Sequence, residues 1–171
     1  EKKIGMIVDE WGTWFTVEPG TNPGFLYQQN TMRDALVAGI NLNIFNKHSD
    51  RVHMANLAQL VNVLQSVILT EGEKMLLTPT YHVFNMYKYH QDAELLDSHM
   101  ETKTIGTGEW NVPNLTESVS VAEDGTLHIT LTNLSLEEDY EIDTTILDKA
   151  VSQVRGEIVT GEMHAKNTFE E

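Results

Sequence analysis

A break near residue 90 limits what this chain can fold into. Residues 1–90 carry 7 basic and 8 acidic side chains, whereas residues 91–171 carry 4 basic and 18 acidic ones. The secondary-structure pattern changes at the same place, from alternating strand-like and helical segments to stretches rich in β-forming residues. At 171 residues and 40% hydrophobic content, the chain can bury one sizeable core or two small ones. We therefore predict two structural units, residues 1–91 and 92–171.

The first unit has the pattern of a parallel α/β fold. The apolar run Ile4–Val8 shows almost no alternation, which is typical of a parallel strand covered on both faces. The capping-box pattern of Thr31 and Asp34 predicts the start of a helix that runs to about residue 46. Arg51–Leu57 returns to a strand-like pattern. The order of these segments predicts parallel strands joined by a helix.

Helical spacing continues after the second strand. Pro79 predicts the first turn of a further helix, which carries several aromatic residues. Between the strand and that helix, apolar residues recur at three- and four-residue intervals and predict another helical stretch: Leu57, Leu60, Val61, Leu64, Val67 and Ile68.

The second unit is expected to be an antiparallel β-sandwich of jelly-roll type. Asp124-Gly125 lies between Ser118–Ala122 and Thr126–Asn133, which is a strong hairpin signal. Tyr140–Leu147 and Gln153–Thr160 resemble further strands. The many carboxylates of this half are expected on its solvent faces.

Neither unit is expected to be complete. Two β/α units cannot close a barrel, which takes roughly 250 residues, and a sandwich usually has about seven strands. The sequence therefore predicts a fragment cut at both ends. We expect such a chain to be marginally stable or to associate through exposed sheet edges.

Charge and composition exclude several classes of function. A formal net charge of −15 disfavours binding to nucleic-acid phosphates or to an anionic membrane. The absence of cysteine excludes thiol catalysis, disulfides and Cys-based zinc sites. No apolar run is long enough for a membrane span. The compartment stays open, because the chain begins at Glu1 without an initiator Met.

Glu10 is the strongest candidate for chemistry. It lies at the predicted carboxyl end of a parallel strand, the position from which α/β sheets present catalytic groups. Trp11 and Trp14 follow closely, and indole rings beside a carboxylate suit a sugar-binding pocket. A carboxylate can stabilise or trap an oxocarbenium-like transition state. From spacing alone the alternative stays open that an acidic residue caps the loop and that both tryptophans fill the core.

Other polar groups give weaker signals. The amides of Asn56, Gln59 and Asn62 surround the end of the second strand and could bind sugar hydroxyls, or could be ordinary surface groups. His48, Asp50 and His53 match no metal-ligand spacing, so we predict no metal site. The aromatic residues of the last helix are expected to pack against a sheet rather than to form a sugar platform: Tyr81, Phe84, Tyr87 and Tyr89.

Several motifs, in order along the chain, resemble the C-terminal third of the α-L-arabinofuranosidases of glycoside hydrolase family 51. They are Ile7-Val8-Asp9-Glu10-Trp11-Gly12-Thr13-Trp14, Asp34-Ala35-Leu36, Lys47-His48-Ser49-Asp50-Arg51-Val52 and Asn56-Leu57-Ala58-Gln59-Leu60-Val61-Asn62. The resemblance covers residues 4–90 in order and continues more loosely through the β-rich half.

The resemblance implies a fold and roles for three residues. Members of that family are retaining, exo-acting enzymes with a (β/α)8 barrel followed by a β-sandwich, so residues 1–91 would supply about the last two β/α units of the barrel. Glu10 would be the nucleophile, Gln59 would hydrogen-bond the arabinose, and Trp14 would shape the pocket near the leaving group. No cofactor is implied, and the intact enzyme is expected to form homo-oligomers. The substrate would be an arabinose-containing polysaccharide or oligosaccharide.

One part of the family's machinery has no counterpart in this chain. The acid/base of such enzymes is the Glu of an Asn-Glu pair at the end of strand four, upstream of the motifs found here. The chain would then carry the nucleophile without a competent active site. Two alternatives stay open: another retaining glycosidase of the same barrel clan, acting on xylan or β-glucan, and a noncatalytic carbohydrate-binding module.

Overall fold

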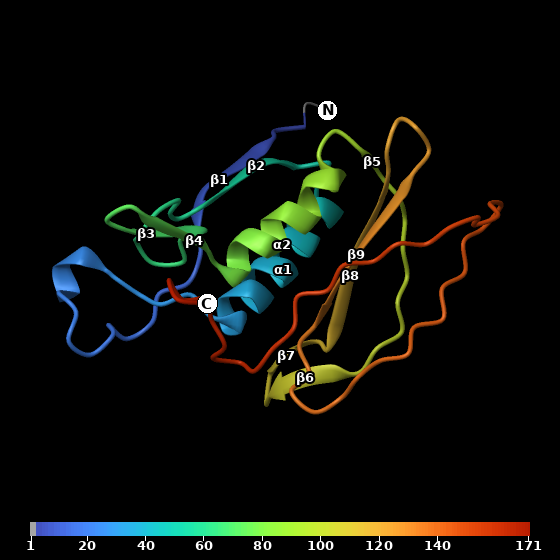
Figure 1. The fold of residues 1–171 in the computed structure, drawn as a ribbon. Helices are drawn as coiled ribbons and strands as arrows, with labels where there is room; N and C mark the ends of the chain where they lie inside the picture. The colour runs from blue at the N-terminus through green and yellow to red at the C-terminus, as the bar shows by residue number, and fades with distance from the viewer. Residues whose placement is uncertain (1–2) are drawn as a thin grey trace.

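The computed structural model describes residues 3–171 (Figure 1). Two helices lie in the middle of the molecule, between a small parallel sheet and an antiparallel sheet. The parallel sheet consists of β1 (Met6–Trp11) and β2 (Val52–Leu57), joined through helix α1 (Met32–Lys47). Both predicted strands and their parallel pairing are therefore confirmed.

Helix α1 begins at the predicted capping box. The Thr31 backbone N–H donates to Asp34 Oδ2 at 2.9 Å, which holds the chain at the start of the first turn. The helix ends at Lys47, one residue beyond the predicted end. Lys47 also places a positive charge in the last turn, where it interacts favourably with the negative end of the helix dipole.

The prediction that β1 is covered on both faces is wrong for this chain. Ile7 is 62% exposed and Met6 is 44% exposed. The sheet has only two strands, so among residues 3–171 β1 has a partner strand on one side only.

The predicted helical stretch after β2 is also wrong. The segment is a loop that leads into the antiparallel hairpin of β3 (Ile68–Glu71) and β4 (Lys74–Leu77). Asn62 and Leu64 have positive φ values of 57° and 52°, which a right-handed helix does not allow. Gln65 and Ser66 are fully buried, so polar contacts rather than an apolar helix face fix this segment.

Helix α2 (Pro79–Tyr87) begins where Pro79 predicts. Thr78 is its N-cap, and its hydroxyl accepts a hydrogen bond from the Tyr81 backbone N–H at 3.3 Å. A short 3-10 turn, η2 (Lys88–His90), extends it. The expected packing of the aromatic residues holds for Tyr87, which is buried, and for Phe84, which stacks on Trp11. It is wrong for Tyr89, which is 50% exposed.

The main core lies between the two helices and the end of β1. Its buried members come from both helices: Met32, Ala35, Ala38, Val83 and Tyr87. Trp11 closes the core from the β1 side, with its ring 5.4 Å from that of Phe45 and 6.2 Å from that of Phe84. The aromatic contacts thus attach the end of β1 to both helices.

The second half is antiparallel, as predicted. Strands β8 (Leu115–Val121) and β9 (Leu127–Asn133) form the expected hairpin, and the turn is held by a 2.8 Å hydrogen bond from the Thr126 backbone N–H to Asp124 Oδ1. Strand β5 (Glu94–Leu95) adds to β8, and β6 (Thr104–Thr107) pairs with β7 (Trp110–Pro113). A closed sandwich and the domain boundary at residue 91 stay predictions.

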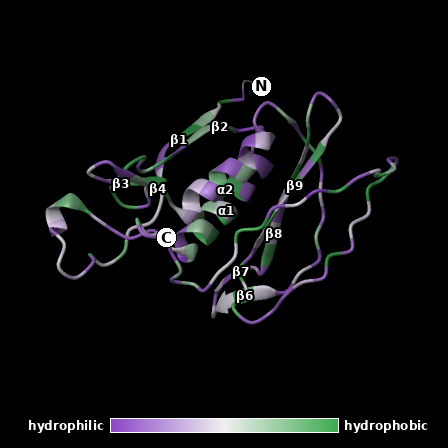
Figure 2. Cartoon of the chain, in the orientation of Figure 1, coloured by the Kyte–Doolittle hydropathy of each residue, from purple (hydrophilic) through white to green (hydrophobic). Residues whose placement is uncertain are grey.

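The two strands predicted in the C-terminal segment are wrong. Residues 134–171 contain no helix or strand, although apolar and polar residues alternate along them (Figure 2). A strand needs a partner edge, and Tyr140–Leu147 and Gln153–Thr160 meet none among residues 3–171. Most of their apolar side chains are exposed, as at Leu147, which is 82% exposed, whereas Val159 packs against the core.

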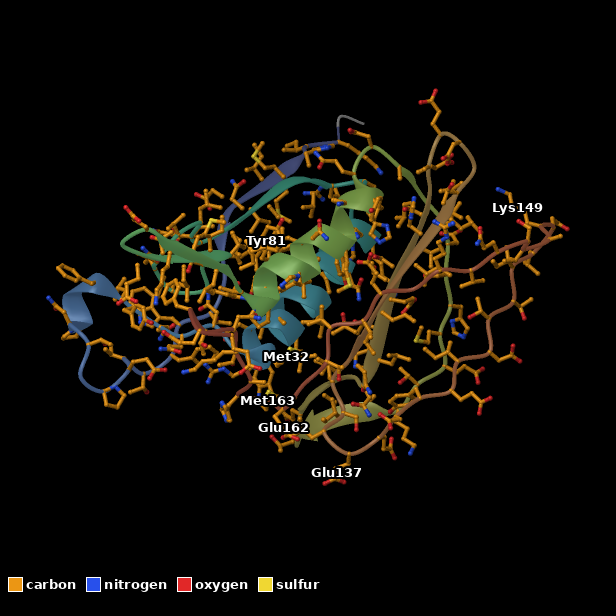
Figure 3. All side chains as sticks on the ribbon, viewed as in Figure 1. Met32, Tyr81, Glu137, Lys149, Glu162 and Met163 are labelled. Atoms are coloured by element: carbon orange, nitrogen blue, oxygen red, sulfur yellow. The ribbon has the colours of Figure 1, made fainter. Side chains whose placement is uncertain are left out.

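The end of this segment returns to helix α1. The Met32 backbone N–H donates to the Ala165 carbonyl at 3.0 Å, and the Arg33 N–H donates to the Met163 carbonyl at 3.1 Å. Figure 3 shows Met163 beside Met32. The two carbonyls satisfy N–H groups that a helix leaves free in its first turn.

A polar interface joins helix α1 to the antiparallel sheet. Asn43 is 1% exposed, and its Oδ1 accepts hydrogen bonds from Tyr87 Oη at 2.8 Å and from Ser118 Oγ at 3.0 Å. His90 continues the interface, with Nδ1 2.7 Å from Ser120 Oγ and Nε2 3.0 Å from Thr130 Oγ1. Hydrogen bonds, rather than an apolar seam, therefore connect the helices to β8 and β9.

We predict that replacing Trp11 weakens the fold through lost packing. Trp11→Leu should lower the free energy of unfolding by about 2 kcal/mol, because the smaller side chain leaves space beside Phe45 and Phe84. Urea denaturation followed by circular dichroism measures the change. Trp110→Leu is the matched control, since Trp110 is 84% exposed, and it should change stability by under about 0.5 kcal/mol. Equal effects of the two substitutions would contradict the assigned packing.

We also predict a loss of stability in mild acid that depends on His90. Burial, with a smaller contribution from the nearby His128, lowers the pKa of His90 to about 4. The unfolded chain, with a histidine pKa of about 6.5, takes up a proton that the folded chain resists, so stability falls as pH drops from about 6.5 towards 4. His90→Gln should flatten this fall in urea denaturation measured across that range. His99→Gln, at an exposed position, should leave it unchanged; an unaltered fall in the His90 variant would refute the assignment.

Candidate functional site

The carboxyl ends of β1 and β2 lie side by side. Trp11 is opposite Leu57 in the register, and the Ala58 backbone N–H donates to the Trp11 carbonyl at 2.8 Å. Glu10 therefore stands at the end of β1, and Gln59 follows the end of β2 at the same edge of the sheet. This edge is where parallel α/β sheets place their ligands.

Glu10 is available to a ligand. Its side chain is exposed, and within residues 3–171 it has no hydrogen-bond or ion-pair partner. The alternative that Glu10 caps the following loop finds no supporting contact in the part of the chain that the structure describes.

The two tryptophans have different roles in the structure. Trp11 fills the core between the helices, as the structural alternative for these residues predicts. Trp14 is 67% exposed and leaves its indole face open, as a sugar-contacting residue requires. Spacing alone could not separate them.

The three amides around the end of β2 are also not equivalent. Asn56 donates from Nδ2 to the Asp9 carbonyl at 3.3 Å, and Asn62 both donates to Thr70 Oγ1 at 2.8 Å and accepts from the Thr70 N–H at 2.7 Å. Asn56 thus links β2 to β1, and Asn62 links the loop after β2 to β3. Gln59 is exposed, and its amide has no hydrogen-bond partner within residues 3–171. Gln59 is thus the amide that is open to a ligand.

The sequence did not predict a polar cluster that lies close to this edge. Thr13 Oγ1 lies 2.9 Å from Asp34 Oδ1 and 3.0 Å from Gln65 Oε1, and Gln65 Nε2 donates to the Asp34 backbone carbonyl at 2.8 Å. Asp34 is 2% exposed and Gln65 is fully buried. The capping box identified Asp34 only as a helix start, and the helical spacing placed Gln65 in the wrong element.

The candidate residues stand on an open surface. A hollow of about 240 Å³ lies on the same loop but is lined by other residues: Phe15, Thr16, Glu18, Gln28 and Arg33. Glu10, Trp14 and Gln59 thus lie outside this hollow.

The structure gives no metal-binding arrangement among residues 3–171, where no three His, Asp or Glu side chains converge. Asp50, between the two histidines considered for a metal, pairs with Lys3 Nζ at 3.1 Å, and this hydrogen bond lowers the pKa of Asp50. In the same described range, neither helix has the length and apolar character to cross a membrane.

Comparison with known proteins identifies the family. Residues 9–171 match the model of the α-L-arabinofuranosidase C-terminal domain. The chain is 46% identical over 172 residues to an intracellular exo-α-L-arabinofuranosidase of Bacteroides ovatus, covering 99% of this chain and 34% of that protein. It is 28% identical over 183 residues to an exo-α-(1→6)-L-arabinofuranosidase of Bifidobacterium longum, covering 98% of this chain and 35% of that protein.

Solved structures agree with these sequence relatives. The GH51 arabinofuranosidase of Xanthomonas axonopodis pv. citri matches with a TM-score of 0.72 and 56% identity, over 76% of this chain and 26% of that one. The thermostable GH51 α-L-arabinofuranosidase of Thermotoga petrophila RKU-1 gives a TM-score of 0.66 and 30% identity, over 78% of this chain and 29% of that one. The chain spans about a third of the length of the curated relatives. It belongs to the family of α-L-arabinofuranosidase C-terminal domains, as its sequence motifs indicated.

Proposed function

We propose that this chain is the nucleophile-bearing C-terminal part of a retaining, exo-acting α-L-arabinofuranosidase. The enzyme would remove terminal arabinofuranosyl residues from arabinan or arabinoxylan. The observation that carries the proposal is the edge where Glu10, without a partner among residues 3–171, stands at the end of a parallel strand beside the strand that leads to Gln59. The names of the relatives support the same activity.

In this proposal β1, α1, β2 and α2 form the last part of a (β/α)8 barrel. The parallel pairing and the connecting helix agree with that architecture. The exposed apolar side chains of β1, including Ile7, would then be covered by neighbouring strands and helices of the barrel. The acidic β-rich half would form most of the accompanying sandwich.

Glu10 would attack the anomeric carbon of a terminal arabinofuranose and form a covalent glycosyl-enzyme. A second carboxylate must protonate the leaving oxygen and later activate water, and in retaining enzymes it lies roughly 5–5.5 Å from the first. We assign this acid/base to a segment outside the chain, so residues 1–171 alone should not turn over substrate. No cofactor takes part, and we expect the intact enzyme to assemble as a homo-oligomer.

We predict that Glu10→Gln in the intact enzyme abolishes hydrolysis of 4-nitrophenyl α-L-arabinofuranoside while arabinose still binds. The amide keeps the shape of the side chain but is a poor nucleophile, so a loss of about 10⁴-fold or more in kcat is expected. Asp9→Asn is the matched control and should stay within about tenfold of wild type, since its side chain is exposed and only its backbone carbonyl is bonded.

The nucleophile can also be identified directly. A fluorinated arabinofuranoside that stalls the covalent intermediate should label the peptide containing Glu10, as peptide mapping by mass spectrometry would show. Labelling of another peptide would assign the nucleophile to a residue of that peptide instead. Hydrolysis of xylosides instead of arabinofuranosides would favour another glycosidase of the clan, and sugar binding without hydrolysis would favour a binding module.

We further predict that Gln59→Ala weakens productive substrate binding. Loss of hydrogen bonds to sugar hydroxyls should lower kcat/KM by about 10- to 100-fold, equivalent to roughly 1–3 kcal/mol. Steady-state kinetics on the same nitrophenyl substrate measures the effect. Gln91→Ala, at another exposed glutamine, should have no effect. If both variants behave as wild type, Gln59 does not contact the sugar.

A further inference from the structure

We propose that Thr13, Asp34 and Gln65 form a positioning cluster that fixes the two loops of the active site relative to each other. The inference rests on the proposed function, because one of these loops follows Glu10 and carries Trp14, and the other carries Gln59. Asp34 and Gln65 are buried and Thr13 is half-buried, so we assign the cluster a role through the loops rather than a contact with the sugar.

The cluster joins three segments that are distant in sequence. Thr13 belongs to the loop after β1, Asp34 lies in the first turn of α1, and Gln65 lies in the loop after β2. The Thr13 hydroxyl, with one proton, lies within hydrogen-bond distance of Asp34 Oδ1 and Gln65 Oε1. Gln65 closes the triangle by donating to the Asp34 backbone carbonyl. Gln65 thus fastens the loop after β2 to α1, and the single hydroxyl proton of Thr13, shared between Asp34 Oδ1 and Gln65 Oε1, fastens the loop after β1 to this pair.

Asp34 provides a rigid base for these contacts. Its Oδ2 accepts from the Thr31 backbone N–H at 2.9 Å and lies 3.2 Å from Thr31 Oγ1, while Oδ1 faces Thr13. The Arg33 guanidinium lies 3.9 Å from Oδ2. A buried carboxylate is costly unless its oxygens are bonded, and here both oxygens have partners. The side chain therefore has little freedom to move.

The loop after β1 is held on both sides of Trp14. Thr13 is bonded to the cluster, and the Phe15 carbonyl accepts from Gln28 Nε2 at 2.7 Å. The Arg33 guanidinium carbon lies 3.3 Å from the centroid of the Phe15 ring. Trp14, between these two anchored residues, is left facing solvent. Its direction is therefore set by its neighbours.

The same anchors act on Glu10 and Gln59. The chain between Glu10 and Thr13 is fixed by the aromatic packing of Trp11 and by the hydrogen bond from Ala58 N–H to the Trp11 carbonyl. Gly12, with φ of 156°, lets this backbone pass close to Ala58, because an added Cβ would lie 3.1 Å from its carbonyl oxygen. Gln65 holds the loop that begins at Ala58 and Gln59. Releasing the cluster should loosen both sides of the sugar site.

A displacement of about 1 Å at a reacting group can cost about 100-fold in rate. Thr13→Val in the intact enzyme removes the hydroxyl at nearly constant volume, and we expect kcat to fall by about 10- to 100-fold with less than about a threefold change in KM. Thr13→Ser restores the hydroxyl and should recover kcat to within about threefold of wild type. Thr16→Val, on the same loop at an exposed position, should behave as wild type.

Gln65→Met tests the cluster from the other loop. This test remains possible if the Thr13→Val variant fails to fold. Both substitutions break the contact between Thr13 and Gln65, and each also breaks one contact with Asp34. The loss of kcat in the double variant should therefore be smaller than the product of the two single losses. The melting temperature of each variant, measured on the same samples, separates positioning from loss of fold: we expect falls of only about 2–4 °C.

Wild-type activity and the Glu10→Gln variant separate the two proposals. If wild type is active and Glu10→Gln is not, while Thr13→Val and Gln65→Met keep wild-type kcat, the positioning role is wrong and the proposed function stands. Three other outcomes would also overturn the positioning role. They are multiplied losses of kcat in the double variant, no recovery of kcat in Thr13→Ser, and losses of kcat that follow loss of folded protein. If wild type fails to hydrolyse arabinofuranosides, the proposed function falls, and the positioning role falls with it.

Discussion

The carboxylate of Asp34 is bonded to two different parts of the chain at once. One oxygen holds the Thr31 backbone at the start of α1, and the other faces the Thr13 hydroxyl of the preceding loop. The first contact is local, and the capping-box pattern of the sequence predicts it. The second contact depends on the tertiary fold, because it needs β1, α1 and the loop after β2 in their final positions. Helix formation and loop placement are therefore coupled in one buried group.

Local signals predicted most of the regular structure. The capping box at Thr31, the proline at position 79 and the turn at Asp124-Gly125 all act over a few residues, and each marked a real boundary. Apolar spacing failed between β2 and β3, because a short irregular segment can carry the same spacing as a helix. What decides that segment is the burial of Gln65 and Ser66, which only the complete fold provides. The strand patterns after residue 134 failed for a related reason, since pairing requires a partner edge.

The candidate site shows the same division between local and tertiary information. The motif around Glu10 indicated a carboxylate at a strand end, and the structure places it there. Spacing alone did not reveal which tryptophan packs inward, because both indoles suit a core or a sugar. Their directions follow from the aromatic contacts of Trp11 with two helices and from the anchoring of the residues around Trp14. The contacts within the positioning cluster could not be predicted, since its three members share no sequence motif.

Helix α1 links the candidate site to the antiparallel sheet. Its first turn holds Asp34, and its later turns place Asn43 and Lys47 against β8, where Lys47 Nζ lies 2.6 Å from Glu117 Oε1. Hydrogen bonds are directional, so this interface restricts the position of α1 on the sheet more strictly than apolar packing would. A disturbance of β8 and β9 should therefore reach the Thr13 loop through the helix, without any contact between sheet and sugar. This coupling gives a physical reason for the β-rich half to stay attached to the segment that carries Glu10.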